Sequence, residues 1–223
     1  MTDIFERVVT ATLPRIEQRG VLNVPVAEIC IAAGASEAEV ATVFDSVDKI
    51  VMAALDRRER EWTHGFIESG ARSIGSTPED RLIAIFDILT SWFHDRDFEG
   101  CLFTNVLIEL GPAHPLGRAC IRHLNKFRAV ITTLAEEAEL DNPHELADSL
   151  YVLIKGAIMS AMEGDLEAAR KAIPMAEFYI VRHRAATKRG TRESWFDNFP
   201  QDDYDEMFIG SSPRANVELE YGF

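Results

Sequence analysis

Residues 26–51 constrain the fold of this chain more than any other stretch. The first part is apolar and ends at Gly34, a residue that readily adopts the left-handed conformation found just after a helix. Ser36 follows with Glu39 three residues later, which is the spacing of a capping box that begins a new helix. The pattern therefore predicts two short helices joined by a tight turn, the second of which runs to near Phe44.

The rest of the chain also has a helical pattern. Apolar residues recur at i, i+3 and i+4, and no alternating pattern with hairpin turns is present, so we predict an all-α fold. Pro14 should kink or shorten the first helix, and Pro174 should interrupt the last. The nine expected helices cover about 3–18, 26–33, 36–44, 46 to beyond 66, 78–93, 100–110, 115–140, 143–163 and 166–186.

Three parts of the chain follow from this reading. With 223 residues and 47% hydrophobic composition, the chain can bury a real core. Residues 1–45 form an N-terminal three-helix domain containing the helix-turn-helix, and residues 46–190 form a larger helical domain. The long fourth helix links the two. Residues 191–223 are rich in Asp, Pro, Gly and Ser and lack a helical period, so they are expected to form a tail.

The charge of the chain is strongly acidic, with 37 acids, 23 lysines and arginines, and a formal net charge of −14. Residues 193–223 contribute half of it, because eight acids stand against one arginine, a net of −7. Residues 1–50 hold eight acids against four cations, a net of −4. Nucleic acid repels an acidic protein at long range, so any DNA-binding surface here must concentrate its cations locally.

Several classes of protein are disfavoured. Cys30, Cys101 and Cys120 are widely spaced and few, which predicts neither a disulfide framework nor a zinc site and favours a reduced cytoplasmic compartment. No targeting segment is visible, and no apolar stretch approaches the roughly 18 to 20 residues of a membrane span. Because no catalytic motif, phosphate loop or metal-ligand spacing is present, we expect no enzyme activity, cofactor or metal.

Particular residues resemble those of the TetR family of one-component transcriptional regulators. Residues 26–36, VAEICIAAGAS, are similar to the family's "V-x-E-I-A-x-x-A-G-V-S", and Val40 and Phe44 stand where the family has helix anchors. Residues 99–105, EGCLFTN, with Glu109-Leu110 and His123-Leu124, resemble a "G-C-L-x-x-N...E-L...H-L" run in many members. The resemblance covers roughly residues 4–185.

The resemblance implies a function. It implies a homodimer whose eighth and ninth helices, about 143–163 and 166–186, form a four-helix interface. It also implies operator DNA bound by paired helix-turn-helix units, and a ligand cavity in the second domain. We therefore expect a transcriptional regulator, and specifically a repressor.

The expected DNA-contact surface departs from the family pattern. Where the family commonly has residues that contact phosphates, this chain has Ala41, Val43 and Val47. Each missing cation removes a contribution from counterion release. The alternative is therefore a dimer of the same fold with weakened or lost DNA binding, acting through a protein partner or as a small-molecule-binding module. The candidate DNA-contacting residues are Ser36, Glu37, Thr42 and Lys49.

The candidate ligand-binding residues are mostly aromatic and lie on the helices that surround the cavity in the family, which favours a small, mainly apolar ligand. Aromatic residues at helical spacing are also ordinary core residues. Asn105, a polar residue on an apolar helix, either bonds backbone or helps to orient a ligand. The candidates are Trp62, Phe66, Phe86, Trp92, Cys101, Phe103, Asn105 and Met159.

The end of the chain carries five cations within eleven residues, from Arg182 to Arg192, followed by the acidic and aromatic segment 195–208. One interpretation is that the cations complement a helix dipole and that a solvated tail follows. The other is that the aromatic tail docks on its own dimer or on a protein partner. Both alternatives remain open from the sequence.

Overall fold

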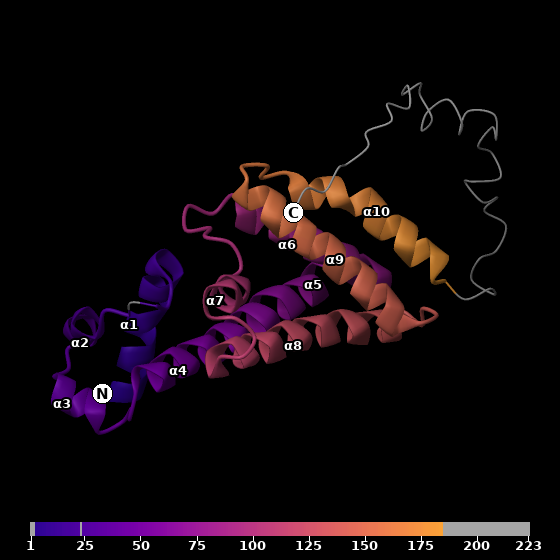
Figure 1. The fold of residues 1–223 in the computed structure, drawn as a ribbon. Helices are drawn as coiled ribbons and strands as arrows, with labels where there is room; N and C mark the ends of the chain where they lie inside the picture. The colour runs from indigo at the N-terminus through magenta and orange to yellow at the C-terminus, as the bar shows by residue number, and fades with distance from the viewer. Residues whose placement is uncertain (1–2, 23, 185–223) are drawn as a thin grey trace, which may run out of the picture. The chain divides into compact units, whose positions relative to one another are not determined.

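The computed structural model describes residues 3–22 and 24–184, and these residues belong to one compact unit. Its helical segments amount to nine separate helices in the described residues, because α4, η1 and α5 form one continuous rod (Figure 1). The segments are α1 (Ile4–Arg19), α2 (Val26–Ala33), α3 (Glu37–Ala41), α4 (Val47–Glu59), η1 (Arg60–Glu68), α5 (Ser69–Ile74), α6 (Pro78–Phe93), α7 (Leu102–Leu110), α8 (Pro115–Glu137), α9 (Pro143–Met162) and α10 (Ala168–Arg182). The described residues contain no strand beyond an isolated bridge, so the all-α prediction is confirmed.

The turn between α2 and α3 has the predicted geometry. Gly34 adopts φ +59° and ψ +44°, the left-handed conformation that costs little only for glycine. The Ser36 hydroxyl accepts a hydrogen bond from the Glu39 N–H, and the Glu39 carboxylate accepts one from the Ser36 N–H. This reciprocal pair is a complete capping box. Val40 and Phe44 are buried, which ties the turn to the core.

The helix α3 is shorter than expected. It ends at Ala41, three residues before the predicted end near Phe44. The N–H groups of Thr42 and Val43 donate to the carbonyls of Glu39 and Val40, three residues back, which tightens the last turn and closes the helix. The expected helix end was therefore wrong, and α3 is only five residues long.

The long central helix changes its hydrogen-bonding pattern part of the way along. It begins at α4, where the Ser46 hydroxyl caps the Lys49 N–H, and it ends at Gly75. Between them, residues Arg60–Glu68 form a π-helix, η1. Such segments are rare and are often found at functional sites. The sequence pattern did not predict this change.

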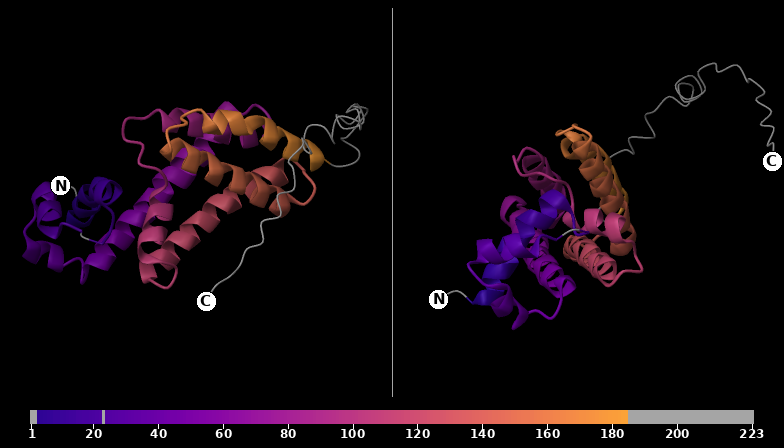
Figure 2. Two further views of the ribbon diagram at one scale, coloured as in Figure 1. Left: turned by 45° about the horizontal axis from the view of Figure 1, so that its top comes forward. Right: turned by 60° about the vertical axis from the view of Figure 1, so that its left-hand side comes forward.

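Helices α6 to α10 form the rest of the larger helical part beside the central rod. The helix α8 lies along α4 and packs against α7 and α9, while α10 packs against α6 and α9 (Figure 1, Figure 2). The core contains large side chains that are fully buried, among them Phe86, Phe93, Leu89, Ile131 and Leu134. At the other end of the rod, α1, α2 and α3 form a small cluster in both views of Figure 2.

Two prolines lie within helices without ending them. α1 runs through Pro14 to Arg19, and α10 runs through Pro174 to Arg182. Both prolines are exposed, so the carbonyl that each leaves without an N–H donor can bond to water. The predicted shortening at Pro14 and the interruption at Pro174 were therefore wrong.

The three cysteines are free and buried in the structure. In the part of the chain that the structure describes, every helix is too short or too polar to cross a membrane. The basic residues from 188 to 192 and the aromatic tail lie outside the described residues, so the hypotheses about them stay predictions. The division of the chain at residue 45 also stays a prediction.

Candidate functional site

The candidate DNA-contacting residues lie together at the exposed end of the first domain, on α3 and the start of α4. Two of their hydroxyls are occupied within the chain. Ser36 exchanges hydrogen bonds with Glu39, and the Thr42 hydroxyl donates to the Glu39 carbonyl at 2.6 Å. Glu37 and Lys49 are exposed. Lys49 also lines an open hollow of about 520 Å³ beside the ends of α1 and α3.

The outward surface around these residues is apolar and acidic. Ile31 is 80% exposed, and Val43 and Val47 are about two-fifths exposed at 39% and 41%. Val43 and Val47 occupy positions that the resemblance assigns to phosphate contacts. Ile31 is largely exposed, so packing does not explain its apolar character, whereas Val43 and Val47 are more than half covered by the protein.

The arginines of the first domain are engaged inside the protein. Arg7 donates to the carbonyls of Ala33 and Gly34 at the end of α2. Every other arginine between residues 3 and 59 forms an ion pair: Arg15 and Arg19 with Glu28, Arg57 with Glu6 and Glu61, and Arg58 with Glu17. Among the described cations of this range, Lys49 alone has no partner. The surface therefore offers few charges for neutralising phosphates.

A carboxylate of α7 holds the segment that follows α1 in place. Glu109, near the end of α7, accepts hydrogen bonds from the N–H of Val21 at 2.9 and 3.0 Å and from the N–H of Leu22 at 2.7 Å. The neighbouring Gly20 has φ +75°, and a Cβ there would lie 2.7 Å from a Glu109 oxygen. Glycine is therefore required at this position both by its backbone conformation and by the close approach of the carboxylate.

An open hollow of about 500 Å³ lies between α1, the central rod and the end of α6. It is bordered by α1, α4, η1, the end of α6 and the turn that follows. Its walls combine aromatic rings with acids: Glu17, Arg58, Glu61, Trp62, Phe66, Trp92, Asp95, Arg96 and Asp97. Two narrow crevices extend from Arg58 and Trp92 towards Cys101, Phe103 and Asn105.

The lining of this hollow has more carboxylates than guanidinium groups. The Arg58 guanidinium lies 3.0 Å from a carboxylate oxygen of Glu17. Burial nevertheless raises the pKa of Glu17 above its ordinary value, and the nearby carboxylates of Asp97 and Glu61 raise it further, while Arg58 opposes the shift. A neutralising cation would relieve this excess of negative charge.

The structure brings together most but not all of the predicted ligand-binding residues. Trp62 and Trp92 face each other with ring centroids 5.5 Å apart, and Phe66 borders the same hollow. Cys101, Phe103 and Asn105 line the crevices, and the Asn105 amide donates to the Glu99 carbonyl, the backbone alternative. Phe86 is wholly buried in the core and lines none of these hollows, and Met159 is 46% exposed on the outer face of α9.

The interface between α4 and α8 contains polar groups that are rarely found in a core. Glu59 is 2% exposed and accepts a hydrogen bond from the Lys126 ammonium at 2.8 Å. His123 is 4% exposed and lies 3.2 Å from an Asp56 carboxylate oxygen. Burial lowers the pKa of His123 below its ordinary value, although Asp56 and Glu59 oppose this shift. The histidine is therefore neutral near pH 7.

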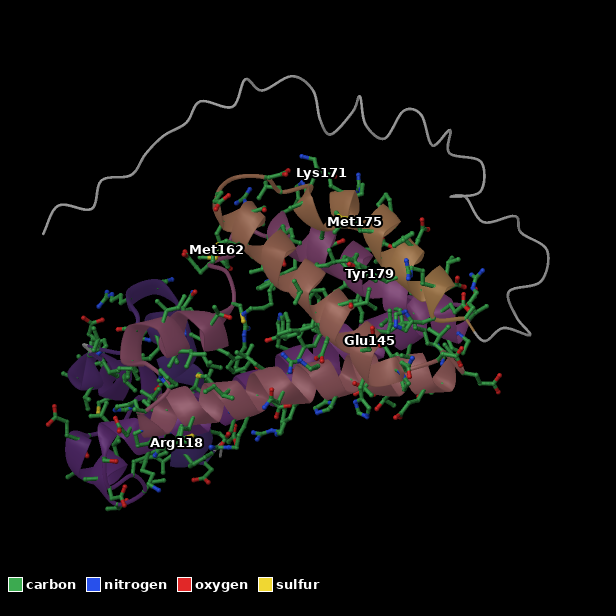
Figure 3. All side chains as sticks on the ribbon, turned by 45° about the vertical axis from the view of Figure 1, so that its right-hand side comes forward. Arg118, Glu145, Met162, Lys171, Met175 and Tyr179 are labelled. Carbon is green, nitrogen blue, oxygen red and sulfur yellow. The ribbon has the colours of Figure 1, made fainter. Side chains whose placement is uncertain are left out.

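The outer face of α9 and α10 is unusually apolar. Figure 3 shows these helices side by side, with Met162 at one end of α9 and Met175 and Tyr179 along α10. Large apolar side chains that are between 37% and 68% exposed gather on the two helices: Val152, Met159, Met162, Met175, Phe178 and Val181. A patch of this kind on a protein surface marks an interaction site.

Sequence reasoning missed Glu17, which lies far from the tryptophans along the chain, and Arg58, although Arg58 stands four residues, about one helical turn, before Trp62. It also gave Glu109 no role, although Glu109 belongs to the "E-L" pair of the resemblance. Only packing brings these charges to the border between the domains. For Glu109, the signal available in the sequence was that it is the one acidic residue of the mostly apolar segment 102–110.

Comparisons with known proteins agree with this architecture. The family model "tetracyclin repressor-like, C-terminal domain" matches residues 78–176. No curated protein sequence matches the chain.

Solved structures show the same fold over most of the chain. A TetR-family transcriptional regulator from Streptomyces coelicolor is 20% identical with a TM-score of 0.72, covering 82% of this chain and 91% of the other. A candidate TetR-type transcriptional regulator from Streptomyces avermitilis is 25% identical with a TM-score of 0.69, covering 82% and 98%. The reduced form of NemR from E. coli is 20% identical with a TM-score of 0.70, covering 80% and 97%.

A helix-turn-helix joined by one long helix to a larger set of helices is the architecture that this chain shares with these solved structures. Residues 78–176 are similar to the C-terminal domain of tetracyclin repressor-like proteins, and most of the chain has the fold of solved TetR-family transcriptional regulators.

Proposed function

We propose that this protein binds operator DNA as a homodimer and that a small ligand in the second domain changes its DNA affinity. The observation that carries this proposal is the continuous rod of α4, η1 and α5. Its first turn is capped by Ser46 beside α3, and its middle borders the hollow through Trp62 and Phe66. We call α1, α2, α3 and the first turn of α4 the reading head. A ligand that displaces the middle of the rod therefore moves the reading head, provided that it binds the two positions of the rod unequally.

The homodimer forms through the apolar face of α9 and α10, which are the eighth and ninth helices of the sequence prediction. Two copies of this two-helix face make a four-helix interface, the packing expected when both helices expose Met, Val and Phe. Burial of the exposed Val152, Met175 and Val181 supplies the hydrophobic driving force. The dimer then presents two reading heads, which suits a palindromic operator.

The reading head binds DNA with few phosphate contacts. Lys49 is the described cation of residues 3–59 that is free to approach a phosphate, and the N-termini of α2 and α4 add their dipoles. Two such lysines per dimer give a slope of the logarithm of affinity against the logarithm of salt concentration of about −2. Base contacts from Glu37 and other α3 side chains would then carry more of the specificity.

Selection of bound fragments from random DNA at about 20 mM salt, where electrostatic attraction is strongest, tests the proposal. We expect enrichment of a palindrome whose half-sites lie about one helical turn apart. If the intact dimer retains no DNA under these conditions and no sequence is enriched, DNA binding is refuted. The alternative, a dimer that acts through a protein partner or as a small-molecule-binding module, would then replace it.

A further inference from the structure

The sequence predicted a small, mainly apolar ligand, but the hollow between α1 and the central rod is lined by several charged side chains. Four carboxylates border it, from Glu17, Glu61, Asp95 and Asp97, against the guanidiniums of Arg58 and Arg96. At about 500 Å³ it has the size of a site for a drug-like ligand. Its wall also includes a residue of the first domain, because Glu17 lies on α1.

The two arginines that line this hollow do not form ion pairs with all of its carboxylates. Arg58 pairs with Glu17, and Glu61 pairs at 2.7 Å with Arg57, which does not line the hollow. Asp95 and Asp97 form no ion pair among the described residues, and neither does Arg96. Two charged carboxylates therefore remain beside a partly buried Glu17 that already carries an excess of neighbouring negative charge.

The aromatic wall provides a second, independent indication of a ligand. Trp62 and Trp92 meet edge to face at 62°, and Phe66 is 39% exposed beside them. The faces of such rings attract cations. The indole nitrogen of Trp62 is buried without a hydrogen-bond acceptor, in a side chain that is only 7% exposed and lines the hollow. Buried N–H groups are nearly always paired, so an uncharged acceptor group on a ligand, separate from its cationic centre, would complete this site.

We infer that the hollow formed by Glu17, Trp62, Trp92 and Asp97 binds an organic cation of drug size, with the aromatic rings against its apolar part and the carboxylates around its charge. This inference names the ligand class for the regulatory domain and so rests on the proposed function. A cation bound here would compete with Arg58 for Glu17. Since that ion pair joins α1 to α4, the ligand acts directly on the reading head.

Tetraphenylphosphonium and tetraphenylborate test the inference, because they match in size and shape and differ in the sign of their charge. The full chain carrying Trp195→Phe retains Trp62 and Trp92 as its tryptophans, so fluorescence quenching reports on the hollow. We expect the cation to quench this fluorescence in a saturable manner and the anion to bind at least about tenfold more weakly, from the Coulomb energy of a partly buried charge. Equal binding of the two ions would overturn the inference.

Single-residue variants place the binding site. Glu17→Gln and Asp97→Asn should each weaken tetraphenylphosphonium binding about fivefold or more, since each removes one charge close to the cation. Glu136→Gln removes the same charge from an exposed position of α8 that does not line the hollow, and it should leave the affinity unchanged. If Glu17→Gln fails to fold, the test of the binding site rests on Asp97→Asn, because Asp97 is exposed. Affinities equal to that of Glu136→Gln would refute the site.

These titrations contain no DNA, so they separate the two proposals. A chain that binds tetraphenylphosphonium through Glu17 and Asp97 but retains no DNA at low salt supports the cation site and refutes the proposed function. A chain that selects a palindrome but does not distinguish the two ions refutes the cation site and leaves the proposed function standing.

Discussion

Two surfaces of this protein expose apolar side chains for opposite reasons. On the face of α9 and α10, Val152, Met175 and Val181 lie among other large apolar residues on two long helices. On the reading head, Ile31, Val43 and Val47 lie among acids, beside a helix of five residues. The first surface has the apolar character of a protein core but is exposed in the single chain. The second is the surface that we propose contacts DNA, and it has few of the cations that phosphates need.

The difference shows that the residues that maintain the fold of a motif and the residues on its outer surface are selected for different purposes. Val40, Phe44 and the capping box of Ser36 and Glu39 serve the fold of the first domain, and they are intact. The arginines near them serve the same purpose, because Arg7 and Arg58 are engaged with carbonyls and carboxylates of the protein. Affinity for DNA depends on cations that are left over, and this domain has few.

The largest effect is expected at the apolar face. Replacing Val152 and Met175 by glutamate should raise the dissociation constant of the dimer at least about 100-fold, because the interface would bury unpaired charges. Sedimentation equilibrium measures this change. Ile108→Glu, at a 71% exposed position on α7, is the matched control and should remain dimeric. A double variant that is still dimeric at the wild-type concentration would place the interface elsewhere.

The next effect concerns how the reading head is held. Glu109→Ala leaves the N–H groups of Val21 and Leu22 without their acceptor, and we expect the free energy of unfolding to fall by about 2 kcal/mol. Chemical denaturation followed by circular dichroism measures it. Glu136→Ala, which removes an exposed carboxylate from α8, should change stability by less than about 0.5 kcal/mol. Equal effects of the two variants would show that the contact with α7 contributes little.

A smaller effect is expected when a cation is restored to the reading head. Val47→Lys should strengthen binding to generic DNA at low salt about tenfold and steepen the salt slope by about 2 per dimer. Fluorescence anisotropy across a salt series provides both values. Ile108→Lys adds the same charge away from the reading head, and it should change the slope little. If both lysines act alike, the effect is one of net charge and not of position.

The smallest effect is on the pH dependence of stability. Because the pKa of His123 is lowered by burial, the unfolded state takes up a proton as the pH falls below about 6.5 while the native state does not. Stability should therefore decline with falling pH by at most about 1.4 kcal/mol per pH unit for this one group. His123→Gln should flatten that decline in thermal unfolding between about pH 7 and 5.

The control for the histidine prediction is His144→Gln, at an exposed position near the start of α9. It should leave the slope of stability against pH as it is in the wild type. A decline that survives His123→Gln unchanged would show that other groups control the response to acid.

Much of the fold was accessible from the sequence because local rules apply along it. The positions of Gly34, Ser36 and Glu39 predicted the turn and its cap, and apolar periodicity predicted the order of the helices. The rules failed where packing or solvent could compensate. Pro14 and Pro174 were tolerated because their faces are exposed, and α3 closed early through hydrogen bonds three residues apart.

The candidate sites were less accessible. The tryptophans were correctly grouped, since Trp62 and Trp92 lie on neighbouring helices whose inner faces could be predicted. Their acidic surroundings could not be predicted in the same way. Asp97 follows a helix end and Glu17 belongs to another domain, so no period or motif connects these residues. The expected apolar character of the ligand came from the aromatic residues alone.

By itself, the sequence determined the helices, the helix-turn-helix skeleton and the resemblance to the TetR family, because these depend on residues close together in the chain or on short quoted motifs. The tertiary structure alone decided how the charges are distributed. It paired Arg58 with Glu17, which are 41 positions apart in the chain. It also brought Glu109 to the amides of Val21 and Leu22, which are 88 and 87 positions away. Electrostatic partners are chosen by distance and burial in space, and the chain positions of these residues specify neither.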